Sequence, residues 1–354
     1  MTEAERLIAN QKYWSGRTQK AAHGLYATQE EKTAAYLSNY TKAYNKIEKE
    51  TAALYAKYSY KGELSRTELY KYERNTKYIE QLKKICTDLG ASEEAFMKTS
   101  FESLYQSAMK NTVEGFGIDF GKISQKQMDQ ILNHPWSGAD YSSRLWKNKE
   151  DLVNKLSQTV TRGAIQGKSI TDMSRELRSN IESSAYDARR LIRTESMHFI
   201  NQGQLDGYRR SGVTQVEILA ASDERTCPTC GGLNGEIVDI AKADSVLPAH
   251  AQCRCTYCPV VATMKIVPSS KNMSAHALEQ AKKRGISTDD INDACAHPLK
   301  SGDIKYDEYG RKSIRNIGKK AEIAYNPDTG IIASVNPTHT KKAQKLMKEK
   351  QDGI

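Results

Sequence analysis

The residues with the clearest chemical potential are cysteines, since five of the seven fall between positions 227 and 258. Cys227 and Cys230 form a C-x-x-C pair followed by two glycines, a spacing that lets a tight turn aim two thiolates at one ion. His250 and Cys253, three residues apart, can supply a second pair of ligands. The segment therefore predicts a structural zinc site with three cysteines and one histidine.

Other roles for these thiols stay open at this stage. Cys255 replaces Cys253 as the fourth ligand if the other face of the strand points inward, because side chains alternate along a strand. C-x-x-C pairs also occur in redox proteins, but this one lacks the strand-then-helix context of that motif. A further alternative to metal binding is that the thiols are simply buried, or that they form disulfides late, in an oxidising particle. Clustered cysteines in a reducing compartment favour metal over these alternatives.

A second set of reactive side chains follows residue 275. Metal-free cleavage of RNA needs a base for the 2′-hydroxyl, an acid for the leaving oxygen and cations for the phosphorane. Two histidines with arginine nearby meet that need. The candidate catalytic residues are His276, Arg284, Ser313, Arg315, Thr338 and His339. In the alternative interpretation these residues have no catalytic role: His276 caps a helix, His339 lies in a surface loop, and Arg315 is a solvated charge on a strand.

The elements that must position these groups begin with long helices. Residues 1–110 contain no proline, and Tyr36, Tyr40 and Tyr44 recur at the spacing of one helix face. The polar faces are wide, so residues 1–130 are interpreted as a helical region that contacts a portal or capsid partner. Helical patterns resume at about residue 150 and continue to about 210, where Ser169 is a candidate N-cap.

The character of the chain changes after Gly212. Residues 213–221 are strand-like, and the next part is rich in Gly, Pro, Asp and Cys. We therefore predict a multidomain chain: a mostly α N-terminal and central region, an α+β cysteine-rich segment within residues 140–262, and a linker at 263–274. A small α+β domain at 275–354 follows, with helices before an antiparallel sheet.

Charge and hydropathy limit the partners. The formal net charge is +10, and the basic excess is concentrated after residue 265, where it can attract RNA or DNA. A merely solubilising surface is the alternative. No run of about 18 apolar residues occurs, and the first residues lack the apolar core of a signal peptide. We expect no membrane span and a location in a cytosol or in a particle assembled there.

Three segments, in order, resemble the Mu F-like phage head-morphogenesis domain. They are the R-T-E of Arg193–Glu195, the D-x-R-T-C-x-x-C of Asp223–Cys230, and the C-R-C after His250, where Ala251 replaces the usual proline. The resemblance covers about residues 140–262. It implies a minor capsid protein that acts near the portal in procapsid assembly, with portal, capsid and scaffold proteins as partners. It also implies the host cytoplasm during assembly and then the virion head.

The order helix–helix–four strands after residue 275 resembles the small ribonuclease-type fold shared by barnase, EndoU and RelE-like toxins. This looser resemblance implies that the head protein carries a metal-free endoribonuclease effector. Whether the chain is an enzyme stays open, because a fold does not establish a function. The alternatives are a purely structural head protein whose C-terminal domain binds nucleic acid or a partner, and a free toxin with an N-terminal delivery region.

Overall fold

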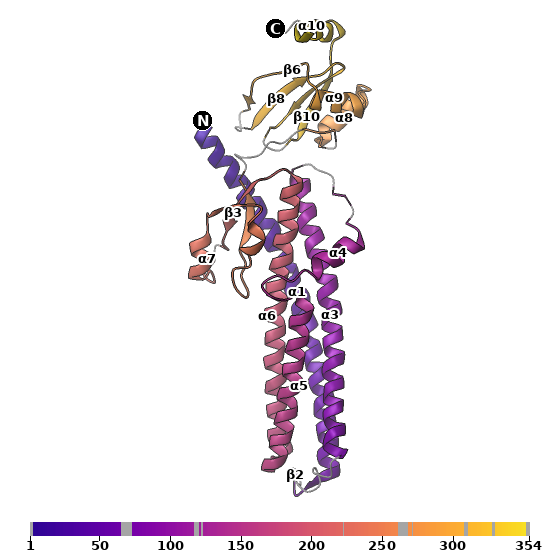
Figure 1. The fold of residues 1–354 in the computed structure, drawn as a ribbon, viewed down its shortest axis with the longest axis vertical. Coiled ribbons are helices and arrows are strands. Elements are labelled where there is room, and N and C mark those ends of the chain that lie inside the picture. Colours follow the sequence, from indigo (N-terminus) through magenta and orange to yellow (C-terminus); the bar gives the residue numbers. More distant parts are fainter. Residues whose placement is uncertain are drawn as a thin grey trace.

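Four long helices form an elongated bundle (Figure 1). The computed structural model describes residues 3–351 except 65–72, 117–119, 122, 222, 261–267, 271, 308–310 and 328–329. The bundle helices are α1 (Glu3–Tyr58), α3 (Glu73–Gly115), α5 (Tyr141–Gln166) and α6 (Ile170–Arg210). A two-residue pair of strands, β1 (Ser59–Tyr60) and β2 (Glu63–Leu64), lies at the far end of the bundle.

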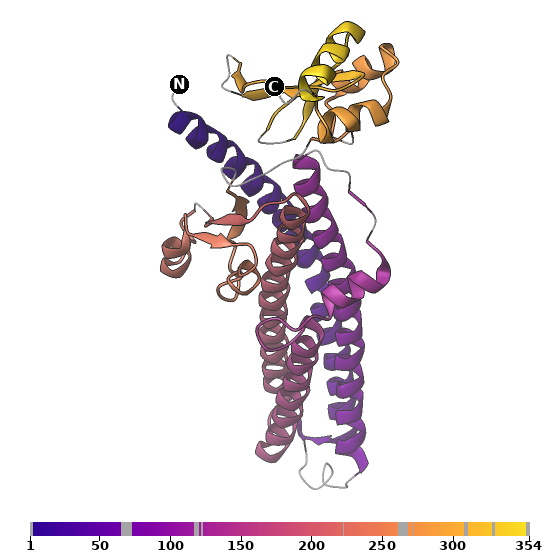
Figure 2. The ribbon, with the colours of Figure 1, turned by 45° about the horizontal axis from the view of Figure 1, so that its top comes forward.

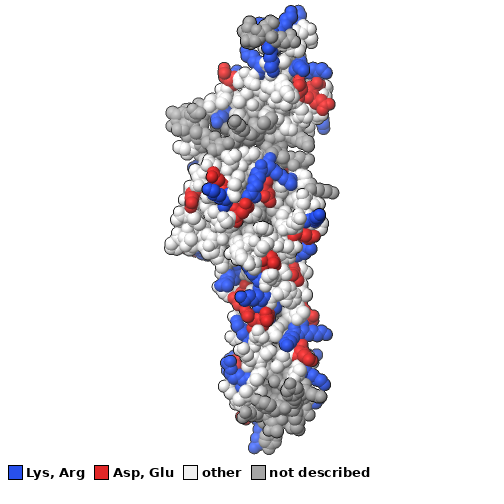
Figure 3. Space-filling view, viewed as in Figure 1, with Lys and Arg blue, Asp and Glu red and all other residues white. Residues whose placement is uncertain are grey.

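The bundle crosses the boundary that the sequence places between residues 130 and 140. Helices α1 and α3 pack on α5 and α6. The N-terminal helices with wide polar faces are therefore covered on their apolar sides by helices of the same chain. Tyr36, Tyr40 and Tyr44 are all buried in that interface. Acidic and basic side chains are interspersed on the outside of the bundle, as expected for solvated helix faces (Figure 3).

Local capping explains where the helices begin and end. Ser169 caps α6 as predicted, because its side chain accepts a hydrogen bond from the Asp172 amide. Ser124 caps the short helix α4 (Gln125–Leu132) in a capping box with Gln127. Gly167 takes the left-handed conformation, with φ of 65°, that ends α5 and turns the chain into α6.

The bundle interior contains one buried polar layer. Lys149 of α5 and Glu93 of α3 form an ion pair of 2.9 Å in which both side chains are almost fully buried. Tyr40 of α1 donates a hydrogen bond of 2.7 Å to the same carboxylate, and Lys149 contacts the Tyr40 hydroxyl. Three helices are therefore joined at one level of the bundle core.

A small sheet packs beside the upper half of α6, and we call residues 213–260 the cysteine-rich lobe. Its strands are antiparallel, in the order β4-β3-β5. The elements are β3 (Gln215–Leu219), α7 (Pro228–Leu233), β4 (Ile237–Asp239), the 3-10 turn η1 (Ala243–Ser245) and β5 (Thr256–Pro259). The first part of α1 crosses this sheet, where Trp14 stacks on Phe116 at 4.4 Å (Figure 2).

The C-terminal unit has two helices before an antiparallel sheet, as predicted, and a third helix after it. The strand order is β10-β9-β8-β6, with β7 also paired to β8. Its elements are α8 (Ala275–Lys283), α9 (Thr288–Ala296), β6 (Lys300–Ser301), β7 (Lys305–Tyr306), β8 (Lys312–Ile317), β9 (Ala321–Tyr325), β10 (Ile332–Pro337) and α10 (Thr340–Gln351). Half of the predicted linker at 263–274, residues 263–267 and 271, lies outside the described residues. Within the described part of the chain, no helix is long and apolar enough to cross a membrane.

Glycines allow α6 to approach α3 closely. A Cβ built on Gly203 would lie 3.1 Å from the Met109 amide nitrogen and still closer to the Tyr105 carbonyl oxygen. We expect Gly203→Ala to lower the free energy of unfolding by about 1–3 kcal/mol, because the backbones must separate. Gly24→Ala, with nothing within 4 Å of the added Cβ, should instead stabilise α1 by roughly 0.5–1 kcal/mol. Urea unfolding followed by circular dichroism measures both; equal effects would contradict the close approach.

Candidate metal centre

The first two candidate ligands lie at the start of α7. Cys227 is the N-cap of this helix, and its Sγ accepts a hydrogen bond of 3.4 Å from the Cys230 amide. Pro228 occupies the first turn, where its missing N–H costs nothing. The turn therefore points both sulfurs to the same side, as the C-x-x-C spacing predicts.

The second pair comes from a loop before β5. The Nε2 of His250 lies 3.2 Å from the Cys227 sulfur and 3.0 Å from the Cys230 sulfur. The Cys253 amide donates to the His250 carbonyl, which closes a turn and brings the Cys253 sulfur to 3.7 Å from that of Cys230. Two loops more than 15 residues apart in sequence thus supply ligands to one point.

These distances fit a tetrahedral zinc ion. Zinc–sulfur bonds of about 2.3 Å and zinc–nitrogen bonds of about 2.0 Å at tetrahedral angles place sulfur and nitrogen about 3.6 Å apart, and two sulfurs about 3.8 Å apart. The sulfur–sulfur distance agrees, and the sulfur–nitrogen distances are slightly shorter. The donor set therefore suits zinc in size and chemistry.

Both candidates for the fourth ligand are close to the cluster. The ligand atoms of Cys227, Cys230 and His250 lie within 4.8 Å of one another, and so do those of Cys230, Cys253 and Cys255. Cys230 belongs to both groups. The structure brings all five predicted metal residues together, and it does not choose between Cys253 and Cys255.

The electrostatics of the thiols separate them into two kinds. A hydrogen bond from the Cys230 amide lowers the pKa of Cys227 to about 7, and a hydrogen bond from the Cys255 thiol lowers the pKa of Cys253 to about 5. The same contact raises the pKa of Cys255, and burial raises the pKa of Cys230 to about 12. The four thiols therefore differ in how readily they ionise, and a zinc ligand must be in the thiolate form.

The remaining cysteines lie apart from the cluster. Cys258 is buried under α1, where its sulfur lies 3.6 Å from the Ser15 hydroxyl. Cys86 and Cys295 are buried in the bundle and in the C-terminal unit. Burial raises the pKa of both to about 11, as expected for small apolar side chains.

The R-T-E motif of α6 has two different structural roles. Arg193 donates a hydrogen bond of 3.0 Å to the Gln252 side chain, and Thr194 accepts one of 3.0 Å from the Gln252 amide. Both residues therefore hold the loop that carries the predicted ligands. Glu195 faces elsewhere: its buried carboxylate accepts from Trp136 at 2.8 Å and pairs with Arg144.

Further contacts hold the strand that follows the ligands. Asn201 of α6 donates to the Cys255 carbonyl at 3.0 Å, and Arg254 pairs with Asp223. This hydrogen-bonded ion pair holds the pKa of the Asp223 carboxyl well below its usual range. Sequence reasoning did not find these roles, although the opposite charges of Asp223 and Arg254, each beside a cysteine pair, were a usable signal.

The six candidate catalytic residues of the C-terminal unit are spread out. The Arg284 guanidinium donates to the Val335 carbonyl at 2.5 Å and to the Asn336 side chain, and Thr338 donates to the Gly318 carbonyl at 2.9 Å. These two side chains connect α8 and the turn after β8 to strand β10. They therefore have structural contacts of their own.

The other four lie at different places around the sheet. His276 follows the cap of α8 near the start of β10 and contacts Gln280, whereas His339 comes after the end of that strand. Ser313 and Arg315 alternate with Asn316, which bonds to α9, so they point away from that helix. Among the described residues, no hydrogen bond joins any two of the six.

Comparison with known proteins agrees with the geometry of the lobe. Residues 154–258 match the family described as Phage Mu protein F like protein. The match spans the end of α5, all of α6 and every predicted zinc ligand, and it ends before the C-terminal unit. It therefore supports the resemblance of this segment to that family.

One curated relative is an enzyme. The chain is 26% identical over 165 residues to NAD(+)--arginine ADP-ribosyltransferase EFV of Enterococcus faecalis (strain ATCC 700802 / V583). The aligned part is 42% of this chain and 34% of that protein, so the chain spans about a third of the length of the relative it matches. No solved structure matches the chain.

Proposed function

We propose that the chain is a phage minor head protein that acts near the portal during procapsid assembly. The family match over residues 154–258 carries this proposal. An elongated bundle with a lateral lobe offers long surfaces for portal, capsid or scaffold proteins (Figure 1). The protein would be made in the host cytoplasm and retained in the virion head.

Mass spectrometry of purified procapsids and mature particles from the encoding phage tests this function. We expect the chain in the head fraction at a constant ratio to the portal, and empty or misassembled heads when its gene is interrupted. A chain absent from every particle fraction, with normal heads after interruption, would contradict the proposal. That outcome would favour the free-toxin alternative.

We further propose that the lobe binds one structural zinc through Cys227, Cys230, His250 and Cys253. The support is the cluster geometry: Cys230 belongs to both groups of ligand atoms, and its sulfur lies 3.0 Å from the His250 Nε2 and 3.7 Å from the Cys253 sulfur, with Cys255 as the alternative fourth ligand. When bound, the ion would link α7 to the loop before β5, and no catalytic role follows from a closed ligand set. Elemental analysis of the purified chain should give one zinc per chain; below roughly a tenth of an equivalent, the proposal fails.

We keep a metal-free endoribonuclease in residues 275–354 as the second candidate function. Its support is a basic unit with two helices before an antiparallel sheet. The test uses the full chain with total RNA and EDTA, beside His276→Ala and His339→Ala. Cleavage that survives EDTA and falls in either variant supports catalysis. No cleavage by the folded chain leaves a domain that binds nucleic acid or a partner.

A further inference from the structure

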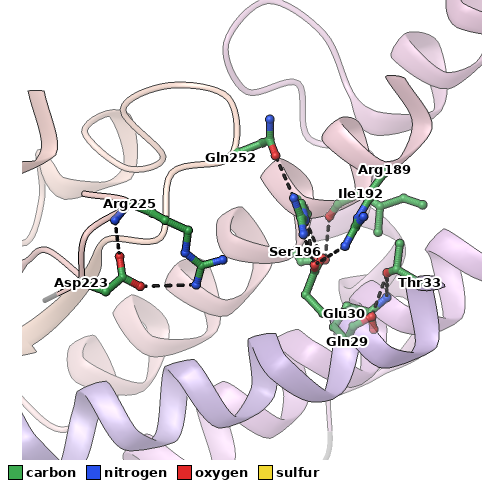
Figure 4. Close-up of polar contacts among 10 residues, drawn as sticks. Gln29, Glu30, Thr33, Arg189, Ile192, Ser196, Asp223, Arg225 and Gln252 are labelled. Carbon is green, nitrogen blue, oxygen red and sulfur yellow. Dashed lines mark hydrogen bonds and ion pairs between the residues drawn. The ribbon is translucent and has the colours of Figure 1, made fainter. Parts of the chain in front are cut away.

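Three separate parts of the chain meet at Arg193. Its guanidinium bonds to the Glu30 carboxylate of α1 through Nε at 2.8 Å and to the Gln252 side chain through Nη1 at 3.0 Å. In Figure 4, Gln252 from the loop and Glu30 from α1 are directed toward the same part of α6, and Arg189 is also directed at Glu30. One side chain of α6 thus connects the N-terminal helix to the cysteine-rich lobe.

Gln252 is well placed to transmit this contact to the metal centre. It lies between His250 and Cys253 and has a φ of 63°, a conformation that non-glycine residues adopt only when their surroundings hold it. Two hydrogen bonds with α6 hold Gln252 in this conformation. Its backbone N–H donates to Thr194, and its side-chain oxygen accepts from Arg193. The backbone between His250 and Cys253 is therefore held in place by α6, which lies outside the cysteine-rich lobe.

The α1 side of this connection is also specific. His23, Tyr26 and Glu30 lie on one face of α1, and burial and the nearby charge of Arg254, next to Cys253, lower the pKa of His23. Arg193 and Glu30 are both about one-fifth exposed, so their ion pair is shielded from most of the solvent. A planar guanidinium can serve two acceptors on different elements at once, which a lysine ammonium does less well.

We propose that Arg193 is a positioning residue that couples metal binding at the cysteine cluster to the docking of α1 on α6, acting through Gln252 and Glu30. The coupling rests on the proposed zinc site. Residues around a metal that orient its ligands commonly change affinity by about 10–100-fold when they are replaced. By reciprocity, a bound ion that orders the Gln252 loop also favours the Arg193–Glu30 contact.

The experiment uses the full chain with and without zinc. Zinc affinity is measured by competition with a chromogenic chelator, and hydrogen–deuterium exchange is followed over residues 20–33. The variants are Arg193→Met and Gln252→Ala; the second changes only a loop side chain and keeps a Cβ at the positive φ. Arg175→Met is the matched control, because this exposed arginine pairs within α6 and touches neither α1 nor the lobe.

We expect both test variants to bind zinc about 10–100-fold more weakly than the parent, with the control unchanged. Zinc should slow exchange over residues 20–33 in the parent and control, and not in Arg193→Met. Affinity within about twofold of the parent in both test variants, with unchanged protection of α1, overturns the coupling alone. A parent chain that binds no zinc overturns the metal site, and the coupling with it.

Discussion

Cys230→Ser is expected to abolish zinc binding and to unfold the cysteine-rich lobe while leaving the bundle helical. Cys230 is buried and is shared by both groups of candidate ligands, so its loss breaks both groups. The lobe has strands of only five, three and four residues, which form too small a core to fold without support. Structural zinc contributes about 10–16 kcal/mol of binding energy in small zinc-dependent folds.

The measurement combines zinc content with limited proteolysis of residues 213–260. Chelation of the parent chain should reproduce the effect of the substitution. Cys258→Ser is the matched control, since this thiol lies in the same lobe, is equally buried, and faces Ser15 and Gln11 instead of the cluster. If Cys230→Ser keeps one zinc and a protease-resistant lobe, the assignment of Cys230 is wrong.

Glu93→Leu and Lys149→Met are each expected to destabilise the bundle by about 3–5 kcal/mol, because each leaves one charge buried without its partner. The pair is 2.9 Å apart, and neither side chain has access to bulk water. Urea unfolding monitored by circular dichroism at the helical signal gives the free energies. The slope of the transition should stay constant if only stability changes.

A variant that combines the substitutions distinguishes the energy of the polar contacts from that of side-chain packing. Glu93→Leu with Lys149→Met and Tyr40→Phe removes every charge and donor of the layer, so most of the lost stability should return. A favourable coupling energy in the double-mutant cycle supports the ion pair. Additive losses, with a triple variant less stable than either single one, would show that these positions contribute through shape alone.

The sequence by itself predicted the candidate metal ligands more fully than any other feature of the chain. Metal ligands are set by residue type and short spacing, so Cys227, Cys230, His250, Cys253 and Cys255 could be named without coordinates. Helix caps such as Ser169 are equally local, because the capping bond spans three residues. The order of helices and strands after residue 275 was also predicted, except for the short strand β6, since periodicity and turn residues are local signals.

The tertiary structure decided what lies opposite each local motif. Wide polar faces on α1 and α3 suggested outside partners, but α5 and α6 of the same chain cover their apolar stripes. Periodicity tells which face is buried and not what buries it. Glu195 sits one residue from Thr194 yet anchors Trp136 instead of the cysteine loop, because neighbouring helix positions point in different directions.

The candidate catalytic residues of the C-terminal unit show most clearly the difference between what the sequence predicts and what the tertiary structure decides. The residue types for acid–base cleavage were present in the sequence, but catalysis depends on their distances in space. The fold ties Arg284 and Thr338 to backbone carbonyls and puts His276 and His339 near different ends of β10. Gln252 is the converse case: nothing in its residue type marked it, and only long-range contacts with α6 place it between the metal ligands and α1. Local spacing identified the candidate ligands. The packing of helices distant in sequence determined which residues hold those ligands in place.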